Sequence, residues 1–453
     1  MSDLSRIVKA YDVRGVVPDE LDERTARALG AAFARFTGAS SVVVARDMRE
    51  SGVALSAAFA LGVNDAGVDV VDAGLGSTDL LYFAAGTLGL PGAMFTASHN
   101  PARYNGIKLC LAGARPVGQD TGLAQVRAEA EQFLDEGVPV VAERGSVTLQ
   151  DLLPSYAEFV RALVPGLQGM RRLRVVVDAG NGMGGLTAPA VLEALPVDLV
   201  PLYFELDGTF PNHEANPIEA ENLRDLQAKV LETGADLGLA FDGDADRCFV
   251  VDEKGGIVSP SVLTGLIAAR ELARVPGSIV IHSCITSRAV PEVIREQGGT
   301  PVATRVGHSF IKAEMAAHDA VFGGEHSGHF YFRDFWNADS GMLAALHTLA
   351  ALGGQDGPLS ALLAGYDRYV ASGEINSTVA DPRASVAEIR AVYADRPLDE
   401  MDGLTVDLDG GAWFNVRPSN TEPLLRLNVE APDEATMVRV RDEVLALVRR
   451  PIG

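Results

Sequence analysis

Short apolar runs alternate with longer segments of helical periodicity along most of the chain. Runs of about four to eight apolar and β-branched residues are typical of buried strands, whereas apolar residues three and four positions apart are typical of helices that cover a sheet. The predicted strands are residues 41–45, 68–71, 92–95, 174–177, 197–204, 237–241, 278–281 and 320–322. The predicted helices include 55–66, 123–136, 188–194 and 262–272. This alternation predicts an α/β protein with parallel or mixed sheets.

The end of the chain has a different pattern. Apolar runs at 404–408, 413–416 and 424–430 are followed by one helical segment at 434–449, which predicts a small α+β module. Upstream of it, three regions each repeat units of a strand followed by a polar loop. Helix starts and stretches rich in Gly, Asp and Pro interrupt this pattern, which divides the chain into predicted domains 1–148, 149–256, 257–368 and 369–453.

Polar loops follow the predicted strands in all three α/β regions. They are residues 46–49 and 98–99 in the first region, 178–181 and 242–246 in the second, and 286–288 with the loop around Glu325 in the third. In open α/β sheets ligands bind outside the carboxyl ends of strands, so three such domains facing one another are expected to form one shared cleft.

Composition narrows the classes of function. The chain has 453 residues, 47% of them hydrophobic, and a net charge of −23, which argues against binding nucleic acid or an acidic membrane through bulk electrostatics. A small anion remains a suitable ligand. Three cysteines without Cys-x-x-Cys spacing are expected to be packed thiols, and neither a secretory leader nor a membrane span is apparent, so we expect a cytoplasmic protein.

The segment 92–101 places Ser98 and His99 on a polar turn that Pro101 closes. A serine beside a histidine offers a nucleophile and a proton acceptor. Ser, Asn and Pro are also ordinary turn formers, so this segment alone leaves a simple turn open.

Three alternating carboxylates, Asp242, Asp244 and Asp246, follow the predicted strand 237–241 and precede Arg247. An EF-hand loop is one alternative, but Arg247 occupies the position where such a loop needs glycine, and the flanks indicate strands rather than helices. Carboxylate oxygens beside an arginine suit Mg²⁺ and a phosphoryl oxygen. The cluster therefore predicts a metal site.

The stretch 180–185 satisfies the G-x-G-x-x-G pattern after a predicted strand, and Glu205 follows at a suitable distance. This pattern is typical of a nicotinamide-dependent dehydrogenase. Asp178 would place a carboxylate beside the pyrophosphate, and the aspartate cluster would be unexplained. We therefore keep the dehydrogenase as the less favoured alternative.

Two further loops carry polar groups suited to a phosphorylated sugar. Glu325 and Ser327 stand between glycines, with His329 after them and His308 after Gly307, which is a pattern suited to sugar hydroxyls. The second loop supplies a guanidinium, two hydroxyls and an amide, the donors that a phosphate needs. These donors are Arg417, Ser419, Asn420 and Thr421.

These four segments, in this order, resemble the phosphoserine, metal, sugar and phosphate loops of the α-D-phosphohexomutase family, and the chain looks most like its bacterial phosphomannomutases and phosphoglucomutases. Residues 9–15, 105–108 and 207–211 add to the resemblance. It implies three similar mixed-sheet α/β domains and a smaller C-terminal α+β domain around a central active-site cleft. It also implies Ser98 as the phosphorylated residue.

The resemblance implies a phosphomannomutase that interconverts mannose 6-phosphate and mannose 1-phosphate through a phosphoserine enzyme and a 1,6-bisphosphate. A dual-specificity phosphoglucomutase and a phosphoglucosamine mutase remain alternatives. The implied cofactors are Mg²⁺ and a hexose 1,6-bisphosphate activator, the partners are hexose phosphates, and both monomer and dimer remain open.

Each site residue receives an expected role from this resemblance. The expected catalytic residues are Ser98, His99, Lys108, Arg247, His329 and Arg14. The expected substrate-binding residues are Tyr11, His308, Glu325, Ser327, Arg417, Ser419, Asn420 and Thr421. The expected metal ligands are Ser98, Asp242, Asp244 and Asp246. Two positions depart from the family pattern: Ala245 stands where many relatives have glycine, and Ser340 stands where an acidic residue is more usual.

Overall fold

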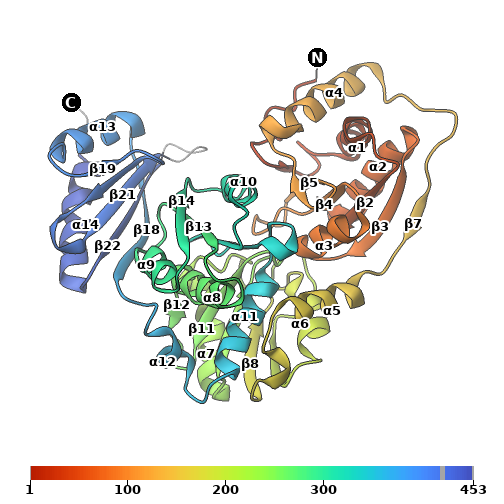
Figure 1. Ribbon diagram of the computed structural model, residues 1–453. Coiled ribbons are helices and arrows are strands. Elements are labelled where there is room, and N and C mark those ends of the chain that lie inside the picture. The colour runs from red at the N-terminus through yellow and green to blue at the C-terminus, as the bar shows by residue number, and fades with distance from the viewer. Residues whose placement is uncertain (1, 419–423, 451–453) are drawn as a thin grey trace. The chain divides into compact units, whose positions relative to one another are not determined.

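The computed structural model describes residues 2–418 and 424–450 (Figure 1). The chain forms two compact units, each built from two separate stretches of sequence. The first unit contains Met1–Pro260 and Ser327–Leu362, and the second contains Ser261–His326 and Leu363–Gly453. The division into four domains with boundaries near residues 148, 256 and 368 stays a prediction.

A seven-stranded mixed sheet lies in the first unit, with the order β1-β5-β4-β2-β3-β7 and β6 paired to β5. Its strands are β1 (Val13–Val16), β2 (Ser41–Arg46), β3 (Asp69–Leu75), β4 (Gly92–Phe95), β5 (Tyr104–Leu111), β6 (Arg115–Pro116) and β7 (Val147–Leu149). Its helices are α1 (Glu23–Thr37), α2 (Glu50–Asp65), α3 (Thr78–Leu88) and α4 (Leu123–Glu136). The apolar faces of α1, α2 and α4 form one core with the strands, in which the Phe59 ring contacts both Phe33 and Phe95.

A second sheet of the first unit has the order β12-β11-β10-β8-β9. Its strands are β8 (Leu173–Asp178), β9 (Val197–Leu202), β10 (Leu237–Phe241), β11 (Cys248–Asp252) and β12 (Ile257–Val258). Because β10 and β11 pair as an antiparallel hairpin, residues 242–247 form the turn between them. The remaining elements of this part are α5 (Leu153–Leu163), α6 (Gly184–Leu192), α7 (Arg224–Thr233), β16 (Phe330–Phe332), β17 (Ala338–Asp339) and α11 (Gly341–Gly353), followed in the sequence by α12 (Leu359–Leu363).

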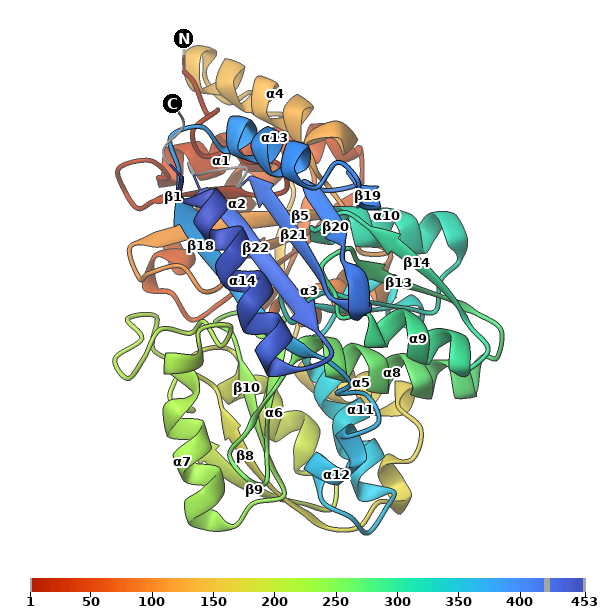
Figure 2. The same ribbon diagram turned by 90° about the vertical axis from the view of Figure 1, so that its left-hand side faces the viewer.

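The second unit begins with parallel strands, in which β13 pairs with both β14 and β15. These elements are α8 (Pro260–Arg274), β13 (Ile279–Ser283), α9 (Ala289–Glu296), β14 (Thr300–Thr304), α10 (His308–His318) and β15 (Phe322–Gly324). An antiparallel sheet of order β18-β22-β21-β20-β19 follows, and α14 lies across it (Figure 2). Its elements are β18 (Val370–Thr378), α13 (Pro382–Val392), β19 (Leu398–Asp399), β20 (Leu404–Asp407), β21 (Trp413–Pro418), β22 (Leu424–Ala431) and α14 (Glu434–Val448).

Most predicted elements are present with shifted ends, and two of the shifts have clear local reasons. The strand predicted at 197–204 ends at Leu202, because Tyr203 has a φ of +54°, which no strand accommodates. The helix predicted at 188–194 begins at Gly184, because the glycine-rich loop leads directly into it. Cys110 and Cys248 are buried thiols, as expected, and Cys284 is half-buried. Within the described residues no helix is both long and apolar enough to cross a membrane.

Candidate active site

Ser98 lies in the turn after β4 in a strained backbone conformation. Its φ is +48°, in the left-handed region that a residue with a side chain adopts only at a cost of about 1–3 kcal/mol. The Ser98 N–H donates to Thr96 Oγ1 at 2.8 Å, and Ser98 Oγ donates to Asp242 Oδ2 at 2.8 Å. Backbone strain at a hydroxyl beside a carboxylate is a feature of functional sites.

The hairpin turn between β10 and β11 brings Asp242, Asp244 and Asp246 together. All three are buried, and one oxygen of each lies within 4.8 Å of the others. Lys108, on β5, donates to Asp244 Oδ2 at 2.7 Å and to Asp246 Oδ2 at 2.6 Å. Within the described chain, Asp244 Oδ1 and Asp246 Oδ1 are buried and have no hydrogen-bond partner. These hard oxygen donors therefore fit a divalent cation.

The protonation states of the groups at this turn also bear on whether it can hold a divalent cation. Burial, together with the charges of Asp246 and Asp244, raises the pKa of Asp242 to about 7 despite the neighbouring Arg247. Burial also opposes ionisation of Asp244, but Lys108 and Thr78 outweigh it and lower its pKa. The two aspartates that it contacts raise the pKa of Lys108 well above its usual value, although burial opposes this, so Lys108 stays protonated.

Arg247 joins the metal turn to the serine turn. Its Nε donates to Asp242 Oδ2 at 2.9 Å, and its Nη2 lies 2.7 Å from His99 Nδ1. An arginine can only donate, so His99 Nδ1 accepts this bond. Burial and the Arg247 charge lower the pKa of His99 to about 2, so this ring is neutral at ordinary pH. The structure does not favour His99 as the proton-transfer residue.

His329 lies directly before β16 and is oriented by an acidic partner. Its Nδ1 is 2.9 Å from Asp339 Oδ2 and 3.9 Å from Asp246 Oδ1. A histidine ring that a carboxylate orients through one nitrogen is a suitable proton-transfer group. His329 is thus near the metal turn, as the expected catalytic role requires.

Arg14, on β1, contacts the serine turn from another direction. Its Nη1 donates to Asn100 Oδ1 and its Nη2 to Asp12 Oδ2, both at 2.6 Å. Its Nε is buried and makes no hydrogen bond with any described residue. Tyr11 is half-buried three positions earlier in the chain. Arg14 is therefore positioned to help hold an anion near Ser98.

The glycine-rich loop 180–185 has a structural role in the fold. The Met183 N–H donates to the Gly243 carbonyl at 2.9 Å, and a Cβ on Gly182 would lie 2.7 Å from the same oxygen. The loop therefore packs against the turn that carries the aspartates. Asp178, which accepts from the Gly180 N–H, also lies 3.1 Å from His213 Nε2. These contacts account for the glycines without a dinucleotide.

In the second unit, the expected sugar and phosphate residues have structural partners. Glu325 is buried after β15 and accepts from the Gly307 N–H at 2.8 Å, immediately before His308 begins α10. Buried Arg417 donates to Asn428 Oδ1 at 2.9 Å and forms an ion pair with Glu374. Ser327 belongs to the first unit. Ser419, Asn420 and Thr421 lie outside the described residues.

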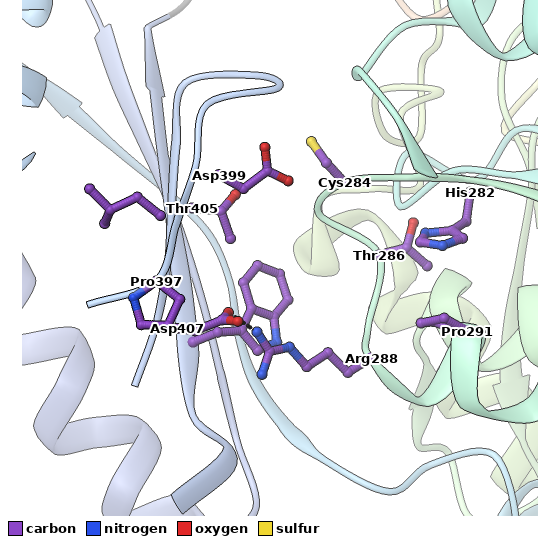
Figure 3. A pocket seen from close by; sticks show the side chains of 11 residues that line it. His282, Cys284, Thr286, Arg288, Pro291, Pro397, Asp399, Thr405 and Asp407 are labelled. Carbon is purple, nitrogen blue, oxygen red and sulfur yellow. Dashed lines mark hydrogen bonds and ion pairs between the residues drawn. The ribbon is translucent and has the colours of Figure 1, made fainter. Parts of the chain in front are cut away.

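A cavity of about 250 Å³ also lies in the second unit, beside the loop after β13 and strands β20 and β21 (Figure 3). Arg288 lines it, forms an ion pair with Asp407 and lies 5.6 Å from the centre of the Trp413 ring. Cys284 also lines it, and burial raises the pKa of this thiol to about 12. The cavity therefore presents an arginine that is already paired and a protonated thiol.

Sequence reasoning missed several residues that organise the site. Thr78 donates its hydroxyl to Asp244 Oδ2 at 2.6 Å and its N–H to the Asp244 carbonyl at 2.9 Å. Asp339 orients His329, and Arg49 contacts the serine turn. Only Arg49 had a visible signal, as a charged residue after a predicted strand.

Comparison with known proteins covers almost the whole chain. Four family models match in order, described as phosphoglucomutase/phosphomannomutase, alpha/beta/alpha domains I, II and III and C-terminal domain, at residues 5–133, 154–256, 261–369 and 374–447.

Individual relatives agree with the family models. The chain is 41% identical to a phosphomannomutase of Salmonella montevideo over 97% of this chain and 98% of the relative. It is 42% identical to proteins named phosphohexose mutases in Xanthomonas campestris, over 98% of both chains. A crystal structure of a phosphoglucomutase/phosphomannomutase family protein from Burkholderia thailandensis matches with a TM-score of 0.89 and 35% identity, covering 100% of this chain and 99% of that one.

Proposed function

Because this chain belongs to the phosphoglucomutase/phosphomannomutase family, we propose that it is a phosphomannomutase that interconverts mannose 6-phosphate and mannose 1-phosphate. The observation that carries the proposal is the pairing of Ser98 Oγ with Asp242, next to two carboxylate oxygens that have no partner within the described chain. A nucleophile beside a site for a divalent cation is the arrangement that phosphoryl transfer requires. A phosphoglucomutase of dual specificity is the second candidate, because some relatives are named phosphomannomutase/phosphoglucomutase.

The reaction begins with a phosphoryl group on Ser98. Transfer breaks the bond between phosphorus and Ser98 Oγ and forms a bond between phosphorus and a sugar hydroxyl oxygen. The hydroxyl proton passes to a base, and Ser98 Oγ takes up a proton. After the bisphosphorylated sugar turns around, its other phosphoryl group returns to Ser98 by the reverse step, and the isomeric monophosphate leaves.

Residues of the first unit supply charge and proton transfer in this proposal. Asp242, Asp244 and Asp246 would hold Mg²⁺, which neutralises charge on the transferring group when it is bound. Arg247 and protonated Lys108 add fixed positive charge. His329, oriented by Asp339, is the proposed residue for exchanging the hydroxyl proton.

The remaining site residues keep their proposed binding roles. Glu325, Ser327 and His308 would bind sugar hydroxyls. Arg417, Ser419, Asn420 and Thr421 would bind the phosphate that is not being transferred, with Arg14 and Tyr11 as further contacts. We also propose a hexose 1,6-bisphosphate as the activator and the cytoplasm as the location of the enzyme.

Two measurements test the proposal. The Ser98→Ala variant should lose at least about 10³-fold in kcat and should no longer accept a phosphoryl group from a hexose 1,6-bisphosphate. Full turnover by this variant would refute the phosphoserine mechanism. The kcat/KM values for mannose 1-phosphate and glucose 1-phosphate, measured in parallel with Mg²⁺, should differ by tenfold or more in favour of mannose, which is about 1.4 kcal/mol. Comparable values would establish the dual-specificity enzyme instead.

A further inference from the structure

Arg49 uses every N–H of its guanidinium within the first unit. Its side chain is only 1% exposed, and it follows β2 at the start of α2. An arginine side chain has five N–H donors. The Nε donates to Asp47 Oδ2 at 3.2 Å, and the four N–H groups on Nη1 and Nη2 donate to four carbonyls at 2.7–3.0 Å. These carbonyls belong to Ser98, Asn100, Pro101 and Tyr104.

Three of these carbonyls lie in the turn that carries the proposed nucleophile, and the fourth, of Tyr104, lies at the start of β5. Carbonyls of a tight turn have no partners in a regular sheet, and leaving them unpaired when buried is unfavourable. One guanidinium therefore binds carbonyls from residue 98 to residue 104 and joins the turn to the start of β5.

Arg49 also belongs to a network that fixes the backbone at Ser98. Asp47 binds Arg49 and accepts a hydrogen bond from Thr96. Thr96 Oγ1 in turn accepts from the Ser98 N–H at 2.8 Å. The left-handed Ser98, with its φ of +48°, is therefore bound on its N–H side through Thr96 and on its carbonyl side through Arg49.

The position of Ser98 matters because the metal turn packs directly on it. A Cβ on Gly243 would lie 2.4 Å from the Ser98 carbonyl oxygen, so the two turns are in close contact there. Phe210, in the loop after β9, covers the guanidinium with its ring centre 5.1 Å from Arg49 Cζ. A shift of the Ser98 carbonyl would move Ser98 Oγ relative to Asp242.

We propose that Arg49 is a positioning residue for phosphoryl transfer, which holds the Ser98 turn in the strained conformation that keeps Ser98 Oγ next to Asp242. It acts through the backbone of the turn and makes no bond to Ser98 Oγ or to the three aspartates within the described structure. This inference rests on the proposed function, because it assigns Arg49 to the same transfer step.

The first test replaces Arg49 with lysine, which keeps the charge but cannot bond four carbonyls at once. The Arg49→Lys enzyme should lose at least about 100-fold in kcat, while KM for the sugar phosphate stays within about threefold. Arg103→Lys is the matched control, because Arg103 is an exposed arginine in the same turn, and its kcat should stay within about twofold of the unmodified enzyme. A kcat within fivefold of the unmodified value for Arg49→Lys would overturn the proposal, as would a loss confined to KM.

Chemical rescue separates positioning from a general loss of fold. In Arg49→Ala, added guanidinium at millimolar concentration should restore kcat at least tenfold with saturation, and it should leave the Arg103→Ala enzyme unchanged. Absence of rescue in a folded Arg49→Ala protein would count against the proposal.

If both Arg49 variants fail to fold, Asp47→Asn decides the question. This change leaves Arg49 in place but weakens its Nε anchor and the link to Thr96, so kcat should fall about tenfold with KM unchanged. An unchanged kcat would overturn the proposal. Failure of the proposed function is distinguishable, because the unmodified protein would then show no mutase activity with any of the sugar phosphates.

Discussion

Asp79 is a buried carboxylate whose cost to folding can be measured. It lies in the first turn of α3, where its oxygens accept hydrogen bonds from Ser77, from the Tyr156 hydroxyl at 2.7 Å and from Ser340 Oγ at 2.6 Å. Burial raises its pKa from 3.8 to about 6, although these hydrogen bonds oppose the rise. The charged form is thus less stable in the folded protein than in the unfolded chain.

The direction in which stability changes with pH follows from the linkage between proton binding and folding. Because the folded-state pKa is raised, the protonated carboxyl contributes stability that is fully present below pH 3.8 and is lost as pH rises through about 6. The full difference corresponds to about 3 kcal/mol, and about half of it is lost between pH 5 and pH 8. An Asp79→Asn variant lacks this ionisation, while its amide can still accept from Tyr156 and Ser340.

The assay is the free energy of unfolding of the first unit, from urea titrations at pH 5 and pH 8. Relative to the unmodified protein, Asp79→Asn should gain about 1.5 kcal/mol of stability between the two pH values. Tyr156→Phe is the control, because it removes one donor but leaves the ionisation in place. A difference between variant and unmodified protein that does not change with pH would refute the reasoning.

Three further predictions concern the active site. Lys108→Met should lower kcat by about 10²-fold or more. Titration calorimetry should also show tighter Mg²⁺ binding, because one positive charge beside Asp244 and Asp246 is removed, and weaker Mg²⁺ binding would contradict this. His99→Asn should leave every ionisation of the kcat/KM pH profile between pH 5 and 9 in place, since the pKa of His99 is about 2, and a missing ionisation would show that this ring does titrate. Thr78→Val should destabilise the metal-free protein by about 1–3 kcal/mol in urea unfolding, because Asp244 Oδ2 loses a buried donor, and an unchanged midpoint would contradict that role.

The sequence allowed the regular elements to be predicted where one residue pattern ran without interruption. Strand β10 and helix α4 have the predicted bounds, because each is an unbroken periodic segment. Strand β5 was missed, because Asn105, Gly106 and Lys108 interrupt its apolar alternation. Two of these positions contact the turns at the site, since Lys108 pairs with the aspartates and the Gly106 carbonyl accepts from the Thr96 N–H.

Site residues could be predicted where the chemistry is local in sequence. The three aspartates and Ser98 could be identified from their spacing and from their position after a predicted strand. Thr78 and Asp79 could not be identified in this way, because their partners Asp244 and Ser340 lie 166 and 261 positions away. Only the packing of α3 against the metal turn and the start of α11 gives these residues a role.

The unusual residue Ser340 gains a physical explanation from the same contacts. Its hydroxyl bonds Asp79, so a carboxylate lies at this junction even though position 340 is not acidic. The buried Asp79 carboxylate thus lies between two groups that orient site residues. Asp339, next to its partner Ser340, orients the proposed proton-transfer residue His329. Thr78, next to Asp79 itself, bonds the proposed metal ligand Asp244. Burial of that charge is unfavourable for folding, and it occurs where the geometry of the proposed site depends on it.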